Sequence, residues 1–296
     1  MGETVQLLGF PEYRGQAEAL ADRLGLARGE VQIHHFPDGE SRLRLPERLP
    51  ATVVLCRSLY DPNPKLVELL LAAAGARELG AERCFLVAPY LCYMRQDKAF
   101  HPGEVVSQRI VGRLLASHFD GVVTVDPHLH RVHRLSDAIP VPRALSLTAT
   151  GPMGHFLADR VQDPLLLGPD EESAQWVAAI AGHRGLDYRV AKKQRLGDRE
   201  VRVTLPAGAY GGRNVVLVDD VASTGRTLEA AARALQPHAP ASVSALVTHA
   251  LFLGDALDRL RSAGVTAVWS CDTIPHGSNA ISLAGLLGEG VRQLLG

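Results

Sequence analysis

The chain has 296 residues, with 31 Lys and Arg against 32 Asp and Glu, so its formal net charge is −1. That balance argues against a protein that coats a nucleic acid or another polyanion, because such binding needs a basic field. Hydrophobic residues make up 46% and charged residues 21% of the chain, which is a globular composition and not a disordered one, and the length favours two lobes over a single core.

Short apolar runs alternate with longer segments of helical periodicity along the chain. Several runs are rich in Val and Leu without alternation, which is typical of parallel strands buried on both faces. This order predicts an α/β protein with mainly parallel sheets. Strands are expected at residues 5–8, 31–35, 52–56, 84–88, 122–125, 165–167, 187–190, 201–205, 215–218, 242–248 and 267–270, and helices at residues 14–24, 64–79, 105–117, 172–183, 227–235 and 253–263.

Sequence features also bear on where the protein works. No apolar run reaches the roughly 18 residues that a bilayer span requires; the best candidate, residues 66–74, is short and contains a glutamate. The first ten residues lack the basic and apolar regions of a signal peptide. None of Cys56, Cys84, Cys92 and Cys271 forms a C-x-x-C pair, which argues against structural zinc. We therefore expect a cytoplasmic protein with reduced thiols.

The two halves of the chain resemble each other. An apolar strand ends in Asp126 in the first half, and another ends in Asp219 in the second. Pro140 and Pro142, which lie between the two halves, discourage a helix or a central strand at that point of the chain. We therefore expect one domain over residues 1–142, a second over residues 143–280, and a C-terminal segment over residues 281–296 that packs back on the first domain.

The strongest chemical signal follows the strand expected at residues 215–218, where Asp219 and Asp220 precede a hydroxyl-rich loop and a helix. Hydroxyls and the free N–H groups at a helix start suit a phosphate monoester. The two acids suit hydrogen bonds from sugar hydroxyls. A plain strand–turn–helix with one capping hydroxyl explains less of the pattern. The loop comprises Ser223, Thr224, Gly225, Arg226 and Thr227.

Two polar segments in the first half allow more than one reading. Phe36 enters an Asp-Gly turn, with Arg42 and Arg44 behind it. These residues are equally consistent with a plain β-hairpin and with a site for a purine and its phosphates. The residues from Arg95 to Lys98 follow the strand at residues 84–88, and by themselves they indicate a solvated loop.

Two further groups suit phosphate chemistry. Asp126 and His128 follow the strand at residues 122–125, and Asp170 follows a strand in the second half. Few protein ligands of this kind fit Mg²⁺, which binds mainly through substrate phosphates, better than Zn²⁺. Lys193 and Arg195 lie in a basic run that is either a solvated strand edge or a mobile arm placing cations on a transferring phosphoryl group.

The loop at residues 219–227 resembles the sugar-phosphate loop of type I phosphoribosyltransferases and of ribose-phosphate pyrophosphokinases. Other segments decide between these families, because they are similar to pyrophosphokinase motifs and follow the family order along nearly the whole chain. The chain resembles a divergent, archaeal-like branch of the ribose-phosphate pyrophosphokinases. The matching segments are residues 36–40 and 93–98 for ATP, residues 126–128 for the metal, residues 168–170, and residues 193–195 for catalysis.

The resemblance implies two type I phosphoribosyltransferase-like α/β domains related by duplication. It implies transfer of the pyrophosphoryl group of MgATP to the anomeric hydroxyl of ribose 5-phosphate, giving 5-phospho-α-D-ribose 1-diphosphate (PRPP) and AMP. The first domain would carry the ATP loops and dimer contacts, and the second the sugar loop and the catalytic arm. A cytoplasmic homodimer or larger homo-oligomer is expected, with no nucleic-acid or membrane partner.

The resemblance also implies a role for individual residues. The cofactor is Mg²⁺, with Asp137 near the metal site. The assigned residues are Lys193 and Arg195 for catalysis; Phe36, Asp38, Gly39, Glu40, Arg95, Gln96 and Asp97 for ATP; Asp219, Asp220, Ser223, Thr224, Gly225, Arg226 and Thr227 for ribose 5-phosphate; and His128, Asp170 and Asp126 for the metal.

The sequence departs from the family pattern at two places. Glu171, Glu172 and Ser173 follow Asp170 where the family has glycines, and Arg226 stands where the pyrophosphokinases have glycine and many phosphoribosyltransferases have arginine. Two alternatives are therefore kept, a transferase that consumes PRPP and a non-catalytic regulatory homologue. The ATP-type motifs of the first half argue against the former, and the two basic residues of the arm argue against the latter.

Overall fold

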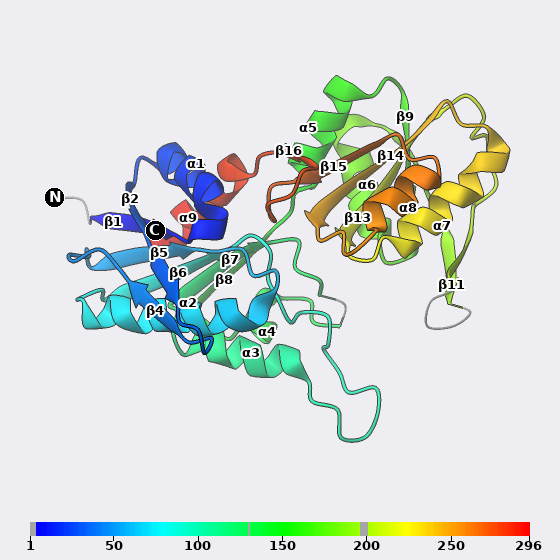
Figure 1. Ribbon diagram of the computed structural model, residues 1–296. Helices are drawn as coiled ribbons and strands as arrows, with labels where there is room; N and C mark the ends of the chain where they lie inside the picture. The colour runs from blue at the N-terminus through cyan, green and yellow to red at the C-terminus, as the bar shows by residue number, and fades with distance from the viewer. Residues whose placement is uncertain (1–3, 130, 196–200) are drawn as a thin grey trace. The chain divides into compact units, whose positions relative to one another are not determined.

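The chain folds into two compact units, each built on its own sheet (Figure 1). The computed structural model describes residues 4–129, 131–195 and 201–296. The first unit comprises Met1–Leu147 and Ala284–Gly296, and the second comprises Thr148–Leu283. Among the described residues, none of the helices has the length and hydrophobicity needed to cross a bilayer.

The first unit contains a six-stranded sheet in the order β2-β1-β5-β6-β7-β8, with every neighbouring pair parallel. All residues of the central strands β5 and β7 are buried, because helices cover both faces of the sheet. The strands are β1 (Val5–Gly9), β2 (Ala27–Glu30), β5 (Thr52–Cys56), β6 (Arg83–Ala88), β7 (Gly121–Val125) and β8 (Arg143–Leu147).

The helices of the first unit cover opposite faces of this sheet because its crossovers run in opposite directions. Right-handed crossovers from β5 to β6 and from β6 to β7 place α2 and α3 on one face, and the return from β1 to β2 places α1 on the other. The C-terminal helix α9 packs beside α1 and against β7 and β8 (Figure 1). The helices are η1 (Pro11–Tyr13), α1 (Arg14–Leu24), α2 (Pro62–Glu78), α3 (Ser107–Ala116), α4 (Leu135–Ala138) and α9 (Ala284–Leu295).

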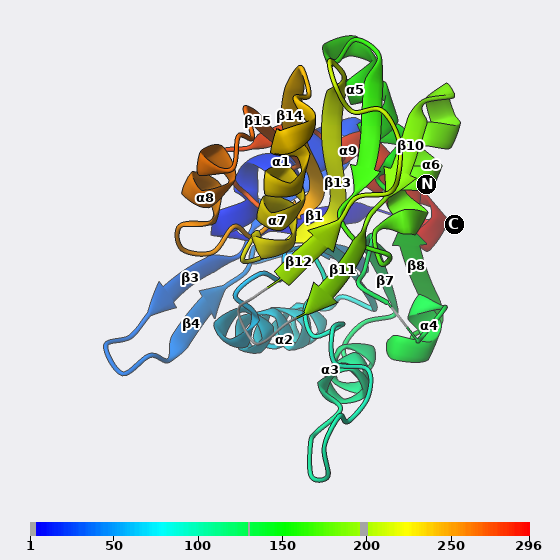
Figure 2. The ribbon, with the colours of Figure 1, turned by 90° about the vertical axis from the view of Figure 1, so that its right-hand side faces the viewer.

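A separate antiparallel hairpin projects from the first unit (Figure 2). It is formed by β3 (Gln32–His35) and β4 (Ser41–Arg44), and the five residues 36–40 connect the two strands. The turn is closed by hydrogen bonds from the Phe36 N–H to the Glu40 carbonyl at 2.8 Å and from the Gly39 N–H to the Phe36 carbonyl at 2.9 Å. The hairpin is therefore internally paired but shares no ladder with the sheet.

The second unit repeats this plan. Its parallel sheet has the order β10-β9-β13-β14-β15-β16, and a second hairpin pairs β11 with β12. The elements are α5 (Thr150–Arg160), β9 (Pro164–Gly168), α6 (Ala174–Arg184), β10 (Asp187–Val190), β11 (Lys192–Arg195), β12 (Val201–Thr204), β13 (Asn214–Ala222), α7 (Arg226–Leu235), η2 (Gln236–His238), β14 (Ser242–Ala250), α8 (Ala256–Ser262), β15 (Ala267–Cys271) and β16 (Asn279–Ile281).

The fold class expected from the sequence is confirmed, since both units are α/β with parallel main sheets and the same strand order. The division between them lies after Leu147, and not after Pro142 as we expected. The cause is β8, which begins directly after Pro142 and pairs with β7 along its whole length. The return segment likewise starts at Ala284 and not at residue 281.

The elements that the sequence did not indicate have weak local signals. The edge strands β2 and β16 have four and three residues and only partly buried patterns, so neither contains an apolar run. Helix α9 contains several glycines, which lower helix propensity. A Cβ atom at Gly290 would lie 2.7 Å from Val123 and 2.9 Å from Leu147. The glycine therefore lets the helix lie close against the sheet, a reason that only tertiary packing supplies.

Candidate active site

Three carboxylates influence one another at one end of the second sheet. Asp170 follows β9, while Asp219 and Asp220 lie within β13, which continues to Ala222 and so includes residues that we expected in a loop. The two strands are parallel neighbours, so their carboxyl ends meet at one edge. The pKa of Asp219 is raised well above its usual value, first by loss of contact with water and then by the charges of Asp220 and Asp170. A cation or a hydroxyl donor would stabilise this edge.

Lys193 extends from β11 to the same group. Its Nζ atom lies 2.7 Å from Oδ2 of Asp170, and the side chains are only 17% and 9% exposed. The Ser173 N–H donates to Oδ1 of Asp170 at 3.2 Å, and the Ser173 hydroxyl donates to the Asp170 carbonyl at 2.6 Å. Both oxygens of the carboxylate are thus held, and the lysine expected in catalysis lies beside an acid expected at the metal.

The residues around this ion pair bear on the departures noted in the sequence. Ser173 is buried and shapes the turn that holds Asp170, whereas Glu171 and Glu172 are exposed. The two extra carboxylates therefore extend toward solvent. Arg195, expected to act with Lys193, is the last residue of β11, and its backbone pairs with Val201. The Arg195 side chain lies outside the described part of the structure.

The expected sugar-phosphate loop runs from β13 into α7. Gly225 has φ +70° at the N-cap of α7, a backbone conformation that favours glycine. The Leu253 N–H donates to the Ser223 carbonyl at 2.9 Å, and the Arg259 guanidinium donates to the Thr224 carbonyl. Arg259 is itself held by Glu229 at 3.1 Å. These contacts engage two carbonyl groups of the loop. Helix α7 begins at the loop, with Arg226 and Thr227 in its first turn, and its N-terminus carries the positive end of the helix dipole.

In the first unit, the expected ATP residues at positions 36–40 form the exposed turn of the β3–β4 hairpin. The Phe36 ring is 40% exposed, lies edge-on to His34 with centroids 5.0 Å apart, and has the Arg42 guanidinium 6.0 Å from its centroid. The Glu40 N–H donates to Oδ1 of Asp38 at 3.2 Å. An exposed ring with a cation beside it is able to stack on a planar base.

The second expected ATP segment follows β6. The Ser107 hydroxyl donates to the Gln96 side chain at 3.2 Å, so α3 fixes this part of the loop. Asp97 is buried, which by itself would raise its pKa, but the side chain and N–H of Arg131 donate to its carboxylate at 2.7 and 3.1 Å and lower the pKa below its usual value. Asp97 therefore connects this loop to the segment after β7. Arg95 lies two residues before Asp97 in the same loop.

That segment carries the expected metal residues of the first unit. Asp126 follows β7 with φ +37°, and its N–H donates to the Leu147 carbonyl at 2.9 Å. His128 lies two residues further on, and Asp137 lies in α4. The third expected ligand, Asp170, belongs to the second unit. Within residues 4–129, 131–195 and 201–296, no three His, Cys, Asp or Glu side chains are grouped to hold a metal ion.

Comparison with known proteins assigns the chain to a family. Residues 5–118 match the N-terminal domain of ribose phosphate pyrophosphokinase, and residues 153–279 match the phosphoribosyl transferase domain. Ribose-phosphate pyrophosphokinase from Methanopyrus kandleri is 36% identical over 280 residues, which cover 94% of this chain and 95% of the relative. The chain belongs to the ribose-phosphate pyrophosphokinase family. It is an enzyme, a transferase of the kinase type, as the sequence motifs indicated.

Further comparisons agree with this assignment. Ribose-phosphate pyrophosphokinase from Sulfolobus acidocaldarius is 34% identical, and the match covers 86% of this chain and 88% of the relative. Both relatives are archaeal, which confirms the branch indicated by the sequence. Phosphoribosylpyrophosphate synthetase from Mycobacterium smegmatis, a solved structure, has a TM-score of 0.85 over 99% of each chain at 22% identity. At that identity the match confirms the fold.

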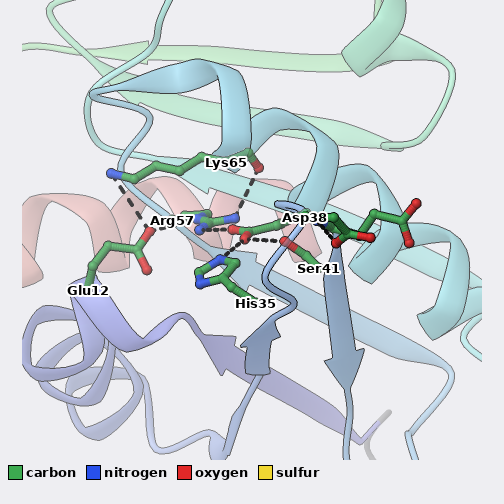
Figure 3. Close-up of polar contacts among 8 residues, drawn as sticks. Glu12, His35, Asp38, Ser41, Arg57 and Lys65 are labelled. Carbon is green, nitrogen blue, oxygen red and sulfur yellow. Dashed lines mark hydrogen bonds and ion pairs between the residues drawn. The ribbon is translucent and has the colours of Figure 1, made fainter.

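The chain contains a buried group of charged residues that no sequence motif indicated. Arg57 directly follows β5, is 2% exposed, and forms ion pairs with Glu12 and Glu68 (Figure 3). The sequence does contain a signal for it, because Arg57 follows the mostly apolar central strand β5 at the same place in the first sheet as Asp219 occupies in the second. Its partners lie 45 and 11 residues away, at spacings that no motif marks.

Proposed function

We propose that this enzyme transfers the pyrophosphoryl group of ATP to the anomeric hydroxyl of ribose 5-phosphate, forming PRPP and AMP. The observation that carries the proposal is the contact of Lys193 Nζ with Asp170 at 2.7 Å, beside Asp219, whose pKa is raised partly by Asp170. A cation on a hairpin arm therefore reaches the edge of the sheet where a sugar phosphate would be held. The membership of this chain in the ribose-phosphate pyrophosphokinase family supports the same reaction.

Ribose 5-phosphate would bind at the carboxyl end of β13. Asp219 and Asp220 would accept hydrogen bonds from sugar hydroxyls, which stabilise crowded carboxylates. The phosphate would lie against the loop before α7, where backbone N–H groups and the positive end of the helix dipole favour an anion. The loop residues are Ser223, Thr224, Gly225, Arg226 and Thr227.

ATP would bind to loops of the first unit. The exposed Phe36 ring is suited to contact adenine, and the neighbouring turn and the loop after β6 offer polar groups for the ribose and phosphates. Asp97 would act mainly by holding its loop, because Arg131 already engages its carboxylate. The remaining residues are Asp38, Gly39, Glu40, Arg95 and Gln96.

Mg²⁺ fits the donor set proposed for the metal. Asp126, His128 and Asp170 offer mainly carboxylate oxygens and too few ligands for a closed cage, which suits an ion completed by water and substrate phosphates. When bound, Mg²⁺ would neutralise charge on the triphosphate. Lys193, with Arg195, would stabilise charge on the transferred group and orient it, and no residue is required as a strong base.

We also propose a cytoplasmic homo-oligomer. Val67 and Leu71 on α2 and Ile110 and Leu114 on α3 are between 38% and 59% exposed, and the two helices cover the same face of the first sheet. Exposed apolar side chains on adjacent helices favour burial against another subunit. All four cysteines lie in the described part of the chain, are buried and form no disulfide there, which suits a reducing compartment.

The test is formation of AMP from ATP that depends on ribose 5-phosphate, with PRPP identified as the second product. A phosphoribosyltransferase would instead release pyrophosphate from PRPP and a nucleobase without using ATP, so both reactions are measured with the same preparation. Activity should disappear with EDTA and return with Mg²⁺, while the circular dichroism spectrum stays unchanged. Unfolding on chelation would indicate a structural metal and contradict the proposed site.

A further inference from the structure

A buried charge cluster lies at the carboxyl edge of the first sheet (Figure 3). Its centre is the Arg57 guanidinium, which donates to Glu12 through Nε at 2.7 Å, to the Lys65 carbonyl through Nη1 at 3.0 Å, and to Oε2 of Glu68 through Nη2 at 2.5 Å. The side chains of Arg57 and Glu68 are each 3% exposed. Arg57 therefore holds the Oε2 side of the Glu68 carboxylate in place.

The other oxygen of Glu68 faces the β3–β4 hairpin. Oε1 of Glu68 is 2.7 Å from Nε2 of His35 and accepts a hydrogen bond from the Ser41 hydroxyl at 2.9 Å. His35 is the last residue of β3, Ser41 is the first residue of β4, and the two pair across the ladder. One carboxylate oxygen thus holds both ends of the turn at residues 36–40.

This contact matters because the hairpin is hydrogen-bonded only to itself in the backbone ladders. The direction of the hairpin relative to the sheet therefore depends on side-chain contacts. Ile33 and Leu43 pack on the core, and Glu68 makes polar contacts with the hairpin. The apolar contacts lie further from the turn than His35 and Ser41 do. The Glu68 carboxylate is therefore the described contact closest to the turn that can set its direction.

The cluster does not form an anion site like that proposed in the second unit. Helix α2 begins with Pro62 and Pro64, which lack N–H groups, and Asp61 at its N-cap adds negative charge. Its buried charges are instead paired with one another and with the hairpin. The arrangement is suited to holding an element in place.

We infer that Glu68, held by Arg57, is a positioning residue for nucleotide binding, because it aims the turn at residues 36–40. The inference rests on the proposed function, in which this turn contacts ATP. Loss of the contacts with Glu68 leaves the residues of the turn unchanged but allows the turn a wider range of orientations. ATP binding then weakens, whereas the ribose 5-phosphate site in the second unit is unaffected.

The experiment compares steady-state kinetics of His35→Ala, Ser41→Ala and Glu68→Gln enzymes. Each should raise KM for ATP, by about tenfold for Glu68→Gln because its hydrogen bonds are charge-assisted, and should leave KM for ribose 5-phosphate unchanged. His35→Gln keeps an N–H donor and should restore near-normal KM. Gln32→Ala, an equally exposed position at the other end of the same strand, is the matched control and should resemble the wild type. Parallel changes in both KM values would overturn the inference.

Two further measurements separate this inference from the proposed function. Hydrogen exchange of the Phe36 and Gly39 amides, both bonded within the turn, should accelerate in all three variants. Unchanged exchange would overturn the positioning role, including in a poorly active enzyme. Faster exchange with unchanged KM for ATP would show that the turn is held by Glu68 but does not bind ATP, and would refute the ATP assignment. In a double-mutant cycle, His35→Ala and Glu68→Gln should be non-additive, and additive effects would count against a shared contact.

If Glu68→Gln does not fold, the Arg57→Met, Glu68→Gln double variant removes both charges and avoids a buried unpaired guanidinium. It should show the same selective rise in KM for ATP. His35 remains informative in either case, since its side chain is 64% exposed and its loss creates no buried charge.

Discussion

The two units place opposite charges at the same point of the same framework. In the first, β5 lies between β1 and β6 and is followed by Arg57, whose charge is balanced by Glu12 and Glu68. In the second, β13 lies between β9 and β14 and carries Asp219 and Asp220, whose charges repel each other and that of Asp170. The charges of the first arrangement are paired within the protein, whereas in the second a bound cation or hydroxyl donor would relieve the repulsion between the carboxylates. The same strand order can thus carry a paired cation at one edge and crowded carboxylates at the other.

The hairpins differ in the same sense. Both have four-residue strands, and Ile33 in β3 and Lys193 in β11 are each the second residue of the first strand. Ile33 packs on the core of its unit, while Lys193 forms an ion pair with an acid at the edge of its sheet. The first hairpin is therefore anchored by apolar packing and presents its turn, and the second presents a cation from its strand.

The largest expected effect is that of Lys193→Ala on turnover. If this side chain stabilises charge that develops in the transition state, kcat should fall by about 10²–10³-fold while both KM values change little. Steady-state kinetics of AMP formation measure this. Lys192→Ala, on the neighbouring exposed position of the same strand, should lose far less. A near-normal kcat for Lys193→Ala would move the catalytic role to Lys192.

The next effect concerns the ion pairs of Arg57 at the edge of the first sheet. Arg57→Met leaves Glu12 and Glu68 without their main partner and should lower the free energy of unfolding by about 3–5 kcal/mol. Urea unfolding of the purified enzyme measures it. Arg77→Met removes a half-exposed pair with Asp120 and should cost about 1 kcal/mol or less. Equal losses for the two variants would mean that the Arg57 cluster gives no special support.

At the carboxylate-rich edge of the second sheet, Asp219→Asn should have the opposite effect on stability. The raised pKa of Asp219 means that the folded state binds its proton more tightly than the unfolded chain, so the wild type loses stability as pH rises through the interval between the two pKa values. In EDTA the variant should therefore melt higher than the wild type at pH 7, and this gain should disappear at pH 4. KM for ribose 5-phosphate should rise about tenfold, with KM for ATP nearly unchanged. A variant less stable than the wild type at pH 7 would contradict the comparison.

The smallest effect concerns Lys65 beside the first cluster. Burial lowers its pKa from 10.5 to about 8, against the attraction of Glu12. Between about pH 8 and 10.5 the unfolded chain therefore retains a proton that the folded state has lost, and stability rises with pH. Relative to Lys65→Met, the wild type should gain on the order of 1 kcal/mol over this interval, less than a fully buried amine because solvent still screens the charge. Urea unfolding at pH 8 and 10 tests this, and a difference that does not change would exclude the lowered pKa.

Local patterns were sufficient for the main elements. The strands Thr52–Cys56 and Asp187–Val190 and the helix Arg14–Leu24 have the bounds expected from the sequence. The sequence also indicated Asp219, Asp220 and the loop before α7 as a candidate site, because they follow a recognisable apolar strand, and their contact with ribose 5-phosphate stays a prediction. The same logic failed for β13, where apolar residues on both sides of the two acids keep the strand going to Ala222.

By itself, the sequence determined the α/β class, the order of the motifs and the family, because hydrophobic periodicity and short motifs are encoded between near neighbours in the chain. Only the tertiary structure showed that Lys193 meets Asp170 and that Glu68 holds both ends of the Phe36 turn, since these partners are 23 to 33 residues apart and come together through packing. It likewise showed that Arg57 is paired with two acids inside the protein, whereas Asp219 lies beside two further carboxylates. The physical reason is that a charge has no fixed meaning in a sequence: its partners and its access to water are set by the fold.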